Sequence, residues 1–314
     1  MKILPSFILL LVIISFLNLQ ENGIFQIIIA QKDISLTKDW SLQNNQTELA
    51  IYNKNIIVQL LADRLEIKLN KSAAILEIAS KLPQIMSLPD ANLIDPSIHG
   101  ISEYEEISKR QVAQNILSVD KDFGRIFYML PNGDMYFEEP YFLQENLTLD
   151  NFVFRDYYKG AVSTGDTYLG DVVLSSSSGL PQFNIVVPLY SNNSGSSENN
   201  TTKNLIGLLT GIQDTSIFKN SLESLPLSEN EIAMYVDSNG NTIASSSSST
   251  NLDNQNQSNK ISFLQSFKDV IDGKSGYNIE NINDHHMLIV YAPVKFKTTT
   301  WGVFFISFLN NTVR

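Results

Sequence analysis

The chain contains no cysteine, and its 314 residues include only three histidines and two tryptophans. The absence of cysteine excludes disulfide frameworks, thiolate metal sites, iron–sulfur clusters and cysteine nucleophiles. Positive charge is also scarce, because 22 Lys and Arg stand against 33 Asp and Glu, a net charge of −11. So acidic a chain repels phosphate backbones, which argues against nucleic acid as a partner. Apolar residues are plentiful at 43%, enough to bury a substantial core and to exclude wholesale disorder.

Catalytic motifs are missing as well. The sequence has no Gly-x-Ser-x-Gly elbow, no His-Glu-x-x-His and no Gly-x-x-x-x-Gly-Lys loop. His285 and His286 are adjacent, so on a strand they point to opposite faces and cannot readily chelate one ion, while His99 lies in a Pro-bounded loop. We therefore expect no enzyme, no metal site and no cofactor.

The N-terminus resembles an export signal. Lys2 precedes an uncharged apolar run over residues 3–19, about 25 Å long as a helix, and a second apolar run ends at Ala30, a candidate cleavage residue. We predict a signal peptide or signal-anchor over 1–30, a buried core helix being the alternative. The remainder is then expected on the extracytoplasmic side of the cell membrane, or secreted if the segment is cleaved. Eight Asn-x-Ser/Thr sequons, such as those at Asn146 and Asn199, are weak support for a glycoprotein.

A long helix is predicted after a polar linker over 31–46. No Pro or Gly interrupts residues 47–82, and apolar or small residues recur there at steps of three and four. The positions on this face are Leu61, Leu65, Leu69, Ala73, Leu76 and Ser80. About 36 residues of helix would span roughly 54 Å, which is typical of a stalk. The same helix is a candidate homodimer interface. A second, shorter helix is predicted over 101–120.

An internal duplication follows the helices. The strand–turn–strand unit around Asn132-Gly133 recurs around Asn239-Gly240, and Asn-Gly between apolar alternations is a strong hairpin signal. Each hairpin is followed by a strand with a proline near its end, at Pro188 and at Pro293, and then by a glycine-led strand. The two copies lie about 106 residues apart, which indicates two related modules with mainly antiparallel sheets of about five strands each.

Three stretches are of low complexity. Serine dominates 175–178 and 245–249, and Asn and Ser dominate 191–203. We expect all three to be surface loops that are too polar to pack and carry no chemistry.

Over roughly residues 45–314 the sequence resembles the double-Cache family of extracellular sensor domains, found in chemotaxis receptors and sensor histidine kinases. The most specific segments are FVFRDYYKGAVSTGDTYLGDVV over 152–173 and LIGLLTGIQD over 205–214. The resemblance implies an α+β fold with a long N-terminal helical spine and two PAS-like Cache modules. It places a membrane-distal module, which holds the ligand pocket, over 83–230 and a membrane-proximal module over 231–314. Family members commonly continue into a second transmembrane helix, so a receptor fragment and a stand-alone Cache protein are both open.

The resemblance also implies the ligand contacts. Arg155 and Tyr157 would hold a ligand carboxylate, Asp214 would hold an amine, and Tyr128 would line the same pocket. Two positions depart from amino-acid-binding members, because Tyr157 stands where Trp is usual and Val173 where Tyr is usual. The ligand is therefore expected to be a small carboxylate or amine at least as readily as an α-amino acid.

The charges of Arg155 and Asp214 support the same site, because a guanidinium binds a carboxylate and a carboxylate on the opposite side binds an ammonium group, as a zwitterion requires. A structural ion pair between Arg155 and Asp214 is the alternative. Tyr136 and Tyr168 are further candidates for the pocket wall, although a core role is as good an explanation for aromatics of this kind.

The expected function is extracytoplasmic sensing of a small molecule, feeding signal transduction or chemotaxis within a receptor, with the membrane contacted through the N-terminal helix. A structural or adhesive surface glycoprotein that keeps the fold without a working pocket is the alternative. Ligand-induced stabilisation separates the two.

Overall fold

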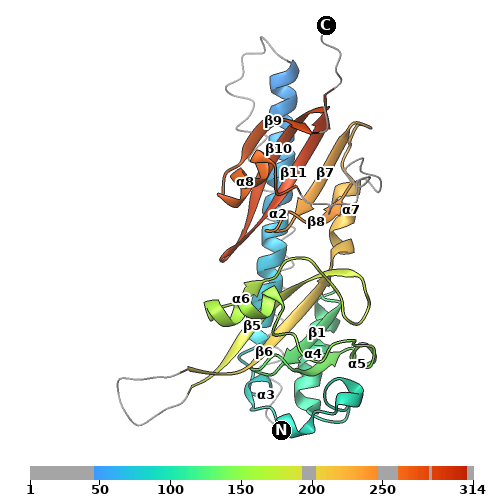
Figure 1. Cartoon of the computed structure of the whole chain (residues 1–314), viewed down its shortest axis with the longest axis vertical. Helices are drawn as coiled ribbons and strands as arrows, with labels where there is room; N and C mark the ends of the chain where they lie inside the picture. Colours follow the sequence, from blue (N-terminus) through green and yellow to red (C-terminus); the bar gives the residue numbers. More distant parts are fainter. Residues whose placement is uncertain (1–45, 193–202, 247–260, 283–284, 310–314) are drawn as a thin grey trace, which may run out of the picture. The chain divides into compact units, whose positions relative to one another are not determined.

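The computed structural model describes residues 46–192, 203–246, 261–282 and 285–309 (Figure 1). They fall into two compact units. The first module comprises Asn70–Ile217, and the second comprises the described residues up to Leu69 and from Phe218 onward. The predicted signal segment over 1–30 lies outside the described residues. Within the described ranges, no helix combines the length and apolarity needed to cross a membrane.

Helix α2, Gln46–Ala79, confirms the predicted long helix. All six positions of the predicted face are buried, from 7% exposed at Ser80 to fully buried at Leu69 and Leu76. The helix ends at Ala79, three residues earlier than expected, and Ser80–Lys81 form a turn before Pro83. Its residues up to Leu69 belong to the second module and those from Asn70 to the first.

The first module contains a six-stranded sheet with strand order β2-β1-β6-β5-β3, and β4 also pairs with β5. All its strand pairs are antiparallel. The strands are β1 Arg125–Met129, β2 Met135–Glu139, β3 Tyr168–Leu169, β4 Val173–Leu174, β5 Pro181–Asn192 and β6 Lys203–Asp214. The short helices and turns are α3 Pro83–Met86, η1 Ala91–Leu93, η2 Pro96–Ile98, α4 Ile107–Val119, α5 Tyr141–Gln144, α6 Asp156–Thr164 and η3 Thr215–Phe218.

The predicted second helix is shorter than expected, because α4 begins at Ile107 rather than at residue 101. The backbone groups of Ile101 and Ser102, where the helix was expected to begin, are hydrogen-bonded to other parts of the module instead. The Ile101 N–H donates to the Tyr136 carbonyl, and the Ile101 and Ser102 carbonyls accept from Arg110. Glu106 then sets the helix start from a left-handed conformation, with φ of 51°.

The second module contains a five-stranded antiparallel sheet with strand order β8-β7-β11-β10-β9. Its strands are β7 Glu231–Val236, β8 Thr242–Ser245, β9 Gly276–Ile282, β10 His285–Phe296 and β11 Thr299–Phe308, with helices α7 Lys219–Glu223 and α8 Gln265–Ile271. The order reproduces that of the first module, with the hairpin strands β7 and β8 in the places of β1 and β2. The predicted duplication of two mainly antiparallel modules is therefore confirmed.

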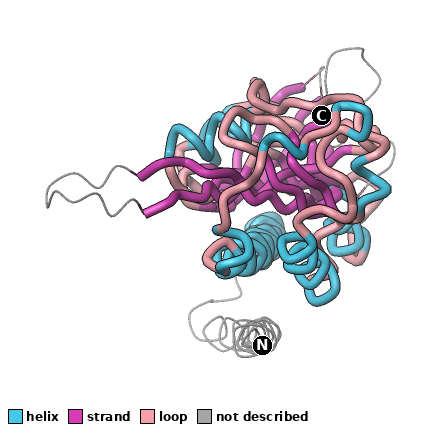
Figure 2. The backbone as a smooth tube through the Cα atoms, turned by 90° about the horizontal axis from the view of Figure 1, so that it is seen from below, coloured by secondary structure: helices cyan, strands magenta, loops and turns pink. Residues whose placement is uncertain are grey.

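The sheet of the first module has two differently covered faces. One face meets α2 and α4, as shown by the bond from Gln213 of β6 to Ser72 of α2 and by the stacking of Arg110 of α4 on Phe137. The other face carries the apolar cluster of Phe127, Met129 and Phe152 under α6. Figure 2 shows this layering, with long helices on one side of the strands and loops with short helices on the other. Side chains alternate between the faces along the regular parts of the strands, and a bulge interrupts the β1–β2 pair between Tyr128 and Met129.

Candidate functional site

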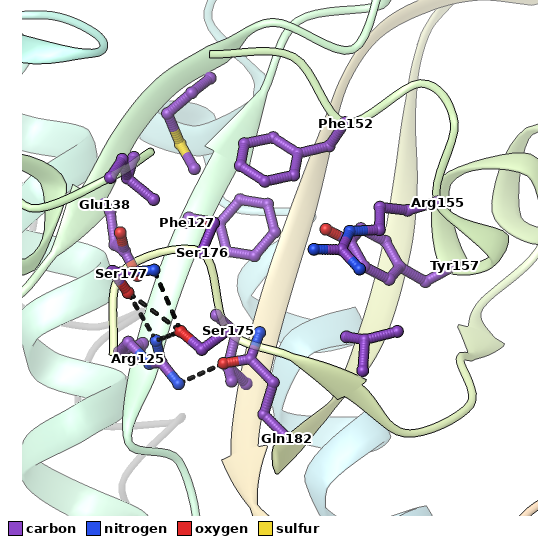
Figure 3. Close-up of a pocket in the computed structure, with 14 residues that line it drawn as sticks. Arg125, Phe127, Glu138, Phe152, Arg155, Tyr157, Ser175, Ser176, Ser177 and Gln182 are labelled. Atoms are coloured by element: carbon purple, nitrogen blue, oxygen red, sulfur yellow. Dashed lines mark hydrogen bonds between the residues drawn. The ribbon is translucent and has the colours of Figure 1, made fainter. Parts of the chain in front are cut away.

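A cavity opens on the α6 side of the first module's sheet (Figure 3). About 290 Å³ of space around its lining is unoccupied by protein atoms, and that space includes open solvent. Its polar lining comprises Arg125, Glu138, Arg155, Gln182 and Ser175–Ser177. Its apolar lining comprises Phe127, Met135, Leu147, Phe152, Tyr157, Val173 and Ile212.

Arg125, at the start of β1, is held in place by protein partners. Its Nη1 donates to the hydroxyl oxygens of Ser175 at 2.6 Å and Ser177 at 2.7 Å, and its Nη2 donates to the Gln182 side-chain oxygen. Asp214 lies 3.4 Å from the same guanidinium. This arginine is buried and engaged, so it serves chiefly to organise the cavity wall.

The serine tract therefore has a role that contradicts the sequence-based expectation. Ser175 is buried, and the tract closes one side of the cavity by accepting hydrogen bonds from Arg125. Composition alone suggests a solvated loop, because the buried guanidinium that recruits these hydroxyls lies 50 residues earlier in the chain.

Glu138 of β2 is a buried carboxyl in the cavity wall. It is 1% exposed, and its Oε2 atom has no hydrogen-bond partner. It lies directly across from Phe127 in the β1–β2 pair, so both side chains point to the cavity face. Burial raises the pKa of the Glu138 carboxyl from 4.5 to about 7, and the positive charge of Arg125 opposes this shift without cancelling it.

Glu138 should make the free energy of unfolding depend on pH. Between pH 4.5 and about 7 the folded protein keeps a proton on Glu138 that the unfolded chain releases, so the contribution of this group to stability is lost as pH rises through about 7. Replacing Glu138 with Gln removes that loss. The free energy of unfolding of the variant should rise by about 3 kcal/mol relative to that of the wild type between pH 4.5 and pH 8.

Urea unfolding of both proteins across this pH range measures the effect. Glu145→Gln, at an exposed carboxyl of the same module, is the matched control and should give a much flatter difference. A wild-type-to-variant difference that stays constant from pH 4.5 to 8 would contradict the assignment.

Arg155 lies at the N-cap of α6 and points its guanidinium into the cavity (Figure 3). Its Nη2 donates to the Leu174 carbonyl at 3.2 Å, and the guanidinium carbon lies 5.0 Å from the Phe154 ring centroid. Its Nε–H is buried without a hydrogen-bond partner. Arg155 thus keeps donor capacity that the described residues do not use fully.

Tyr157 and two phenylalanines form the aromatic part of the wall. The Tyr157 ring meets Phe127 edge-on at 6.4 Å between centroids, and Phe127 lies 6.0 Å from Phe152. Burial raises the pKa of the Tyr157 hydroxyl, which keeps it neutral. In Figure 3 Glu138 and Arg155 lie on different sides of the Phe127 and Phe152 rings.

Tyr128 and Tyr136 lie on the opposite face of the sheet, away from this cavity. Tyr128 is fully buried, stacks on Phe137 at 5.8 Å and donates its hydroxyl to the Ile206 carbonyl. The Tyr136 hydroxyl donates to Glu106 and accepts from the Asp90 N–H. Because neighbours in a strand alternate, the position of Phe127 on the cavity face turns Tyr128 away.

Tyr168 and Asp214 lie near the cavity but not in its lining. A Cβ at Gly160 of α6 would come within 2.5 Å of the Tyr168 ring, so this tyrosine is packed beneath the helix. Asp214 ends β6 with 40% of its side chain exposed, next to Arg125. The structure therefore brings Arg155 and Tyr157 together, while Asp214 is 3.4 Å from Arg125 rather than paired with Arg155.

Two further unpartnered polar side chains belong to the same face. Asn184 of β5 is fully buried, and neither its amide nitrogen nor its amide oxygen has a partner. Thr210 of β6 is fully buried with an unpartnered hydroxyl and lies directly across from Phe127. Buried polar atoms without partners are uncommon, and the cavity face of the sheet carries those of Glu138, Asn184 and Thr210.

Several solved structures share the fold of this chain. No curated protein sequence matches the chain. Among solved structures, the ligand-binding domain of the Pseudomonas aeruginosa PAO1 amino acid chemoreceptor PctB, in complex with L-Arg, has a TM-score of 0.55 and 13% identity. The match covers 85% of this chain and 99% of that one. The equivalent domain of PctC, in complex with GABA, has a TM-score of 0.54 and 13% identity over 82% of this chain and 99% of that one.

A third similar structure is the ligand-binding domain of the Pseudomonas fluorescens chemoreceptor CtaA in complex with L-serine. It has a TM-score of 0.55 and 15% identity, covering 83% of this chain and 98% of that one. At these identities the likeness shows the fold. The family model described as Cache domain, of the double type, matches residues 38–307. Since that match spans well over half of the sequence, the chain belongs to the Cache domain family.

Proposed function

We propose that the chain is an extracytoplasmic sensor domain that binds a small carboxylate-bearing molecule in the cavity of the first module. Double Cache domains are sensory ligand-binding domains and not enzymes. The observation that carries the proposal is Arg155, whose guanidinium lines the cavity and whose Nε–H is buried without a partner.

The chemistry of Arg155 favours a carboxylate. A planar guanidinium can donate two parallel hydrogen bonds to one carboxylate, whereas its present partner is a single carbonyl, that of Leu174. A buried donor without an acceptor, such as the Arg155 Nε–H, destabilises the protein. A bound carboxylate would accept this hydrogen bond and also attract the guanidinium by its charge. Tyr157 and Phe127 supply apolar contact area beside it.

The similar structures support a ligand of this class, because they were solved with L-Arg, GABA and L-serine. Tyr157 and Val173 differ from the residues that the double-Cache resemblance leads one to expect in amino-acid binders. We therefore extend the proposed ligands to small carboxylates in general. Within a receptor, occupancy of this cavity would be the input to signal transduction or chemotaxis, with the N-terminal segment as the membrane tether.

A thermal-shift screen of the purified full chain against α-amino acids, ω-amino acids, simple carboxylates and amines tests the proposal. A ligand present at about 100 times its Kd should raise Tm by roughly 5–10 °C, because binding only the folded state stabilises it by about 2.7 kcal/mol. If no carboxylate-bearing compound raises Tm, the proposal fails and the structural or adhesive alternative is favoured.

A further inference from the structure

The cavity lining contains a carboxyl group that the family resemblance does not assign to ligand binding. Glu138 is 1% exposed, lines the cavity and has an unpartnered Oε2. Asp214, the carboxylate expected to hold an amine, is outside the lining, is 40% exposed and lies 3.4 Å from Arg125. The two carboxylates therefore differ in desolvation, which governs strong recognition of a cation, and in direct pairing with Arg125, whose charge also acts on Glu138 without a hydrogen bond to its Oε2.

Glu138 and Arg155 occupy separate parts of the cavity wall. Glu138 comes from β2, and Arg155 comes from the start of α6. Figure 3 shows them on different sides of the Phe127 and Phe152 rings. A ligand that contacts both would lay its carbon skeleton against aromatic surface and present a cation at one end and a carboxylate at the other.

Resting on the proposed function, we propose that Glu138, rather than Asp214, receives the cationic group of the ligand, so that the preferred ligands are zwitterions held between Arg155 and Glu138. Glu138 acts as a specificity-determining residue. It discriminates an amino acid from the corresponding simple acid, because a buried carboxylate without a cation is disfavoured.

Arg125 of β1 and Tyr157 of α6 interact electrostatically with Glu138, and Arg155 at the start of α6 lines the same cavity. Tyr157 remains neutral because burial raises its pKa. The Glu138 carboxyl itself, with a pKa raised to about 7, becomes fully ionised only above neutral pH in the empty cavity. Affinity for a zwitterion should therefore rise between pH 6 and pH 8, whereas affinity for the simple acid should not rise.

Calorimetric titration of the full chain with matched pairs of compounds tests the proposal. The pairs are 4-aminobutyrate with butyrate, L-alanine with propionate, and L-leucine with 4-methylpentanoate. The wild type should bind at least one zwitterion more tightly than its matched acid. Glu138→Gln should weaken that zwitterion by on the order of 30-fold or more, leave the matched acid unchanged or tighter, and remove the rise with pH.

Asp214→Asn is the matched control, because it neutralises the other carboxylate with the same change of atoms. It should keep the preference of the wild type within roughly threefold. The assignment is overturned if Asp214→Asn removes the preference while Glu138→Gln keeps it, or if Glu138→Gln leaves the preference unchanged. Glu138→Asp keeps the charge and should retain part of the preference, whereas a loss equal to that of Glu138→Gln would count against a charge effect.

The outcomes separate this inference from the proposed function. If the acids bind to the wild type without any preference for zwitterions, Arg155 keeps its role and only the Glu138 assignment fails. If no compound of any pair binds the wild type, the proposed function itself fails. Thermal unfolding of each variant verifies that altered binding does not reflect loss of the fold.

Discussion

Replacing Arg110 with Ala is expected to destabilise the first module by roughly 3–5 kcal/mol, because it leaves a buried partner charge uncompensated. The Arg110 side chain is buried and donates to Glu139 at 2.8 Å. It also donates to the carbonyls of Ile101 and Ser102, and it stacks between the rings of Phe137 and Tyr141 at 5.2 Å from each. Urea unfolding of the variant and wild type measures the loss.

A double variant distinguishes the effect of the uncompensated charge from the effect of lost packing. Adding Glu139→Gln to Arg110→Ala removes the uncompensated charge, so part of the lost stability should return, and the effects of the two substitutions should not be additive. Lys159→Ala, at an exposed cation of α6, is the control and should change stability by less than about 0.5 kcal/mol. A loss below about 1 kcal/mol for Arg110→Ala would show that this network does not hold α4 to β2.

The architecture was largely predictable because its signals are local. The uninterrupted run with helical spacing gave α2, and its predicted face from Leu61 to Ser80 is buried throughout. The two Asn-Gly turns gave hairpins whose turn glycines, Gly133 and Gly240, adopt φ of 85° and 84°, a left-handed conformation that favours glycine. The repeat then predicted two sheets, and their strand orders are equivalent.

The cavity was only partly predictable, because its polar groups come together through tertiary structure. Arg155 and Tyr157 lie in one segment with a recognisable pattern, and both line the cavity. Glu138 carries no sequence signal, since it becomes distinctive only when β2 buries it opposite Phe127. An alternating pattern fixes that Phe127 and Tyr128 face opposite sides, but it does not say which side α6 covers.

Replacing Arg155 with Ala should abolish detectable binding of carboxylate ligands, with a loss of roughly 2–5 kcal/mol for a desolvated charge pair. The guanidinium is the cationic group that lines the cavity with unused donor capacity, because Arg125 is engaged by Ser175, Ser177 and Gln182. Arg155→Lys should recover only part of the affinity, since an ammonium cannot reproduce the two parallel bonds of a guanidinium. The dissociation constants are measured by calorimetric titration.

Titration of one carboxylate ligand from the thermal-shift screen into wild type, Arg155→Ala and Lys159→Ala tests the central claim most directly. Lys159, four residues along α6 from Arg155 and exposed, controls for a change in net charge. A ligand held by Arg155 should bind the wild type and Lys159→Ala alike, and should bind Arg155→Ala at least about 30-fold more weakly or not at all. Equal affinity for all three proteins would mean that the ligand site lies elsewhere.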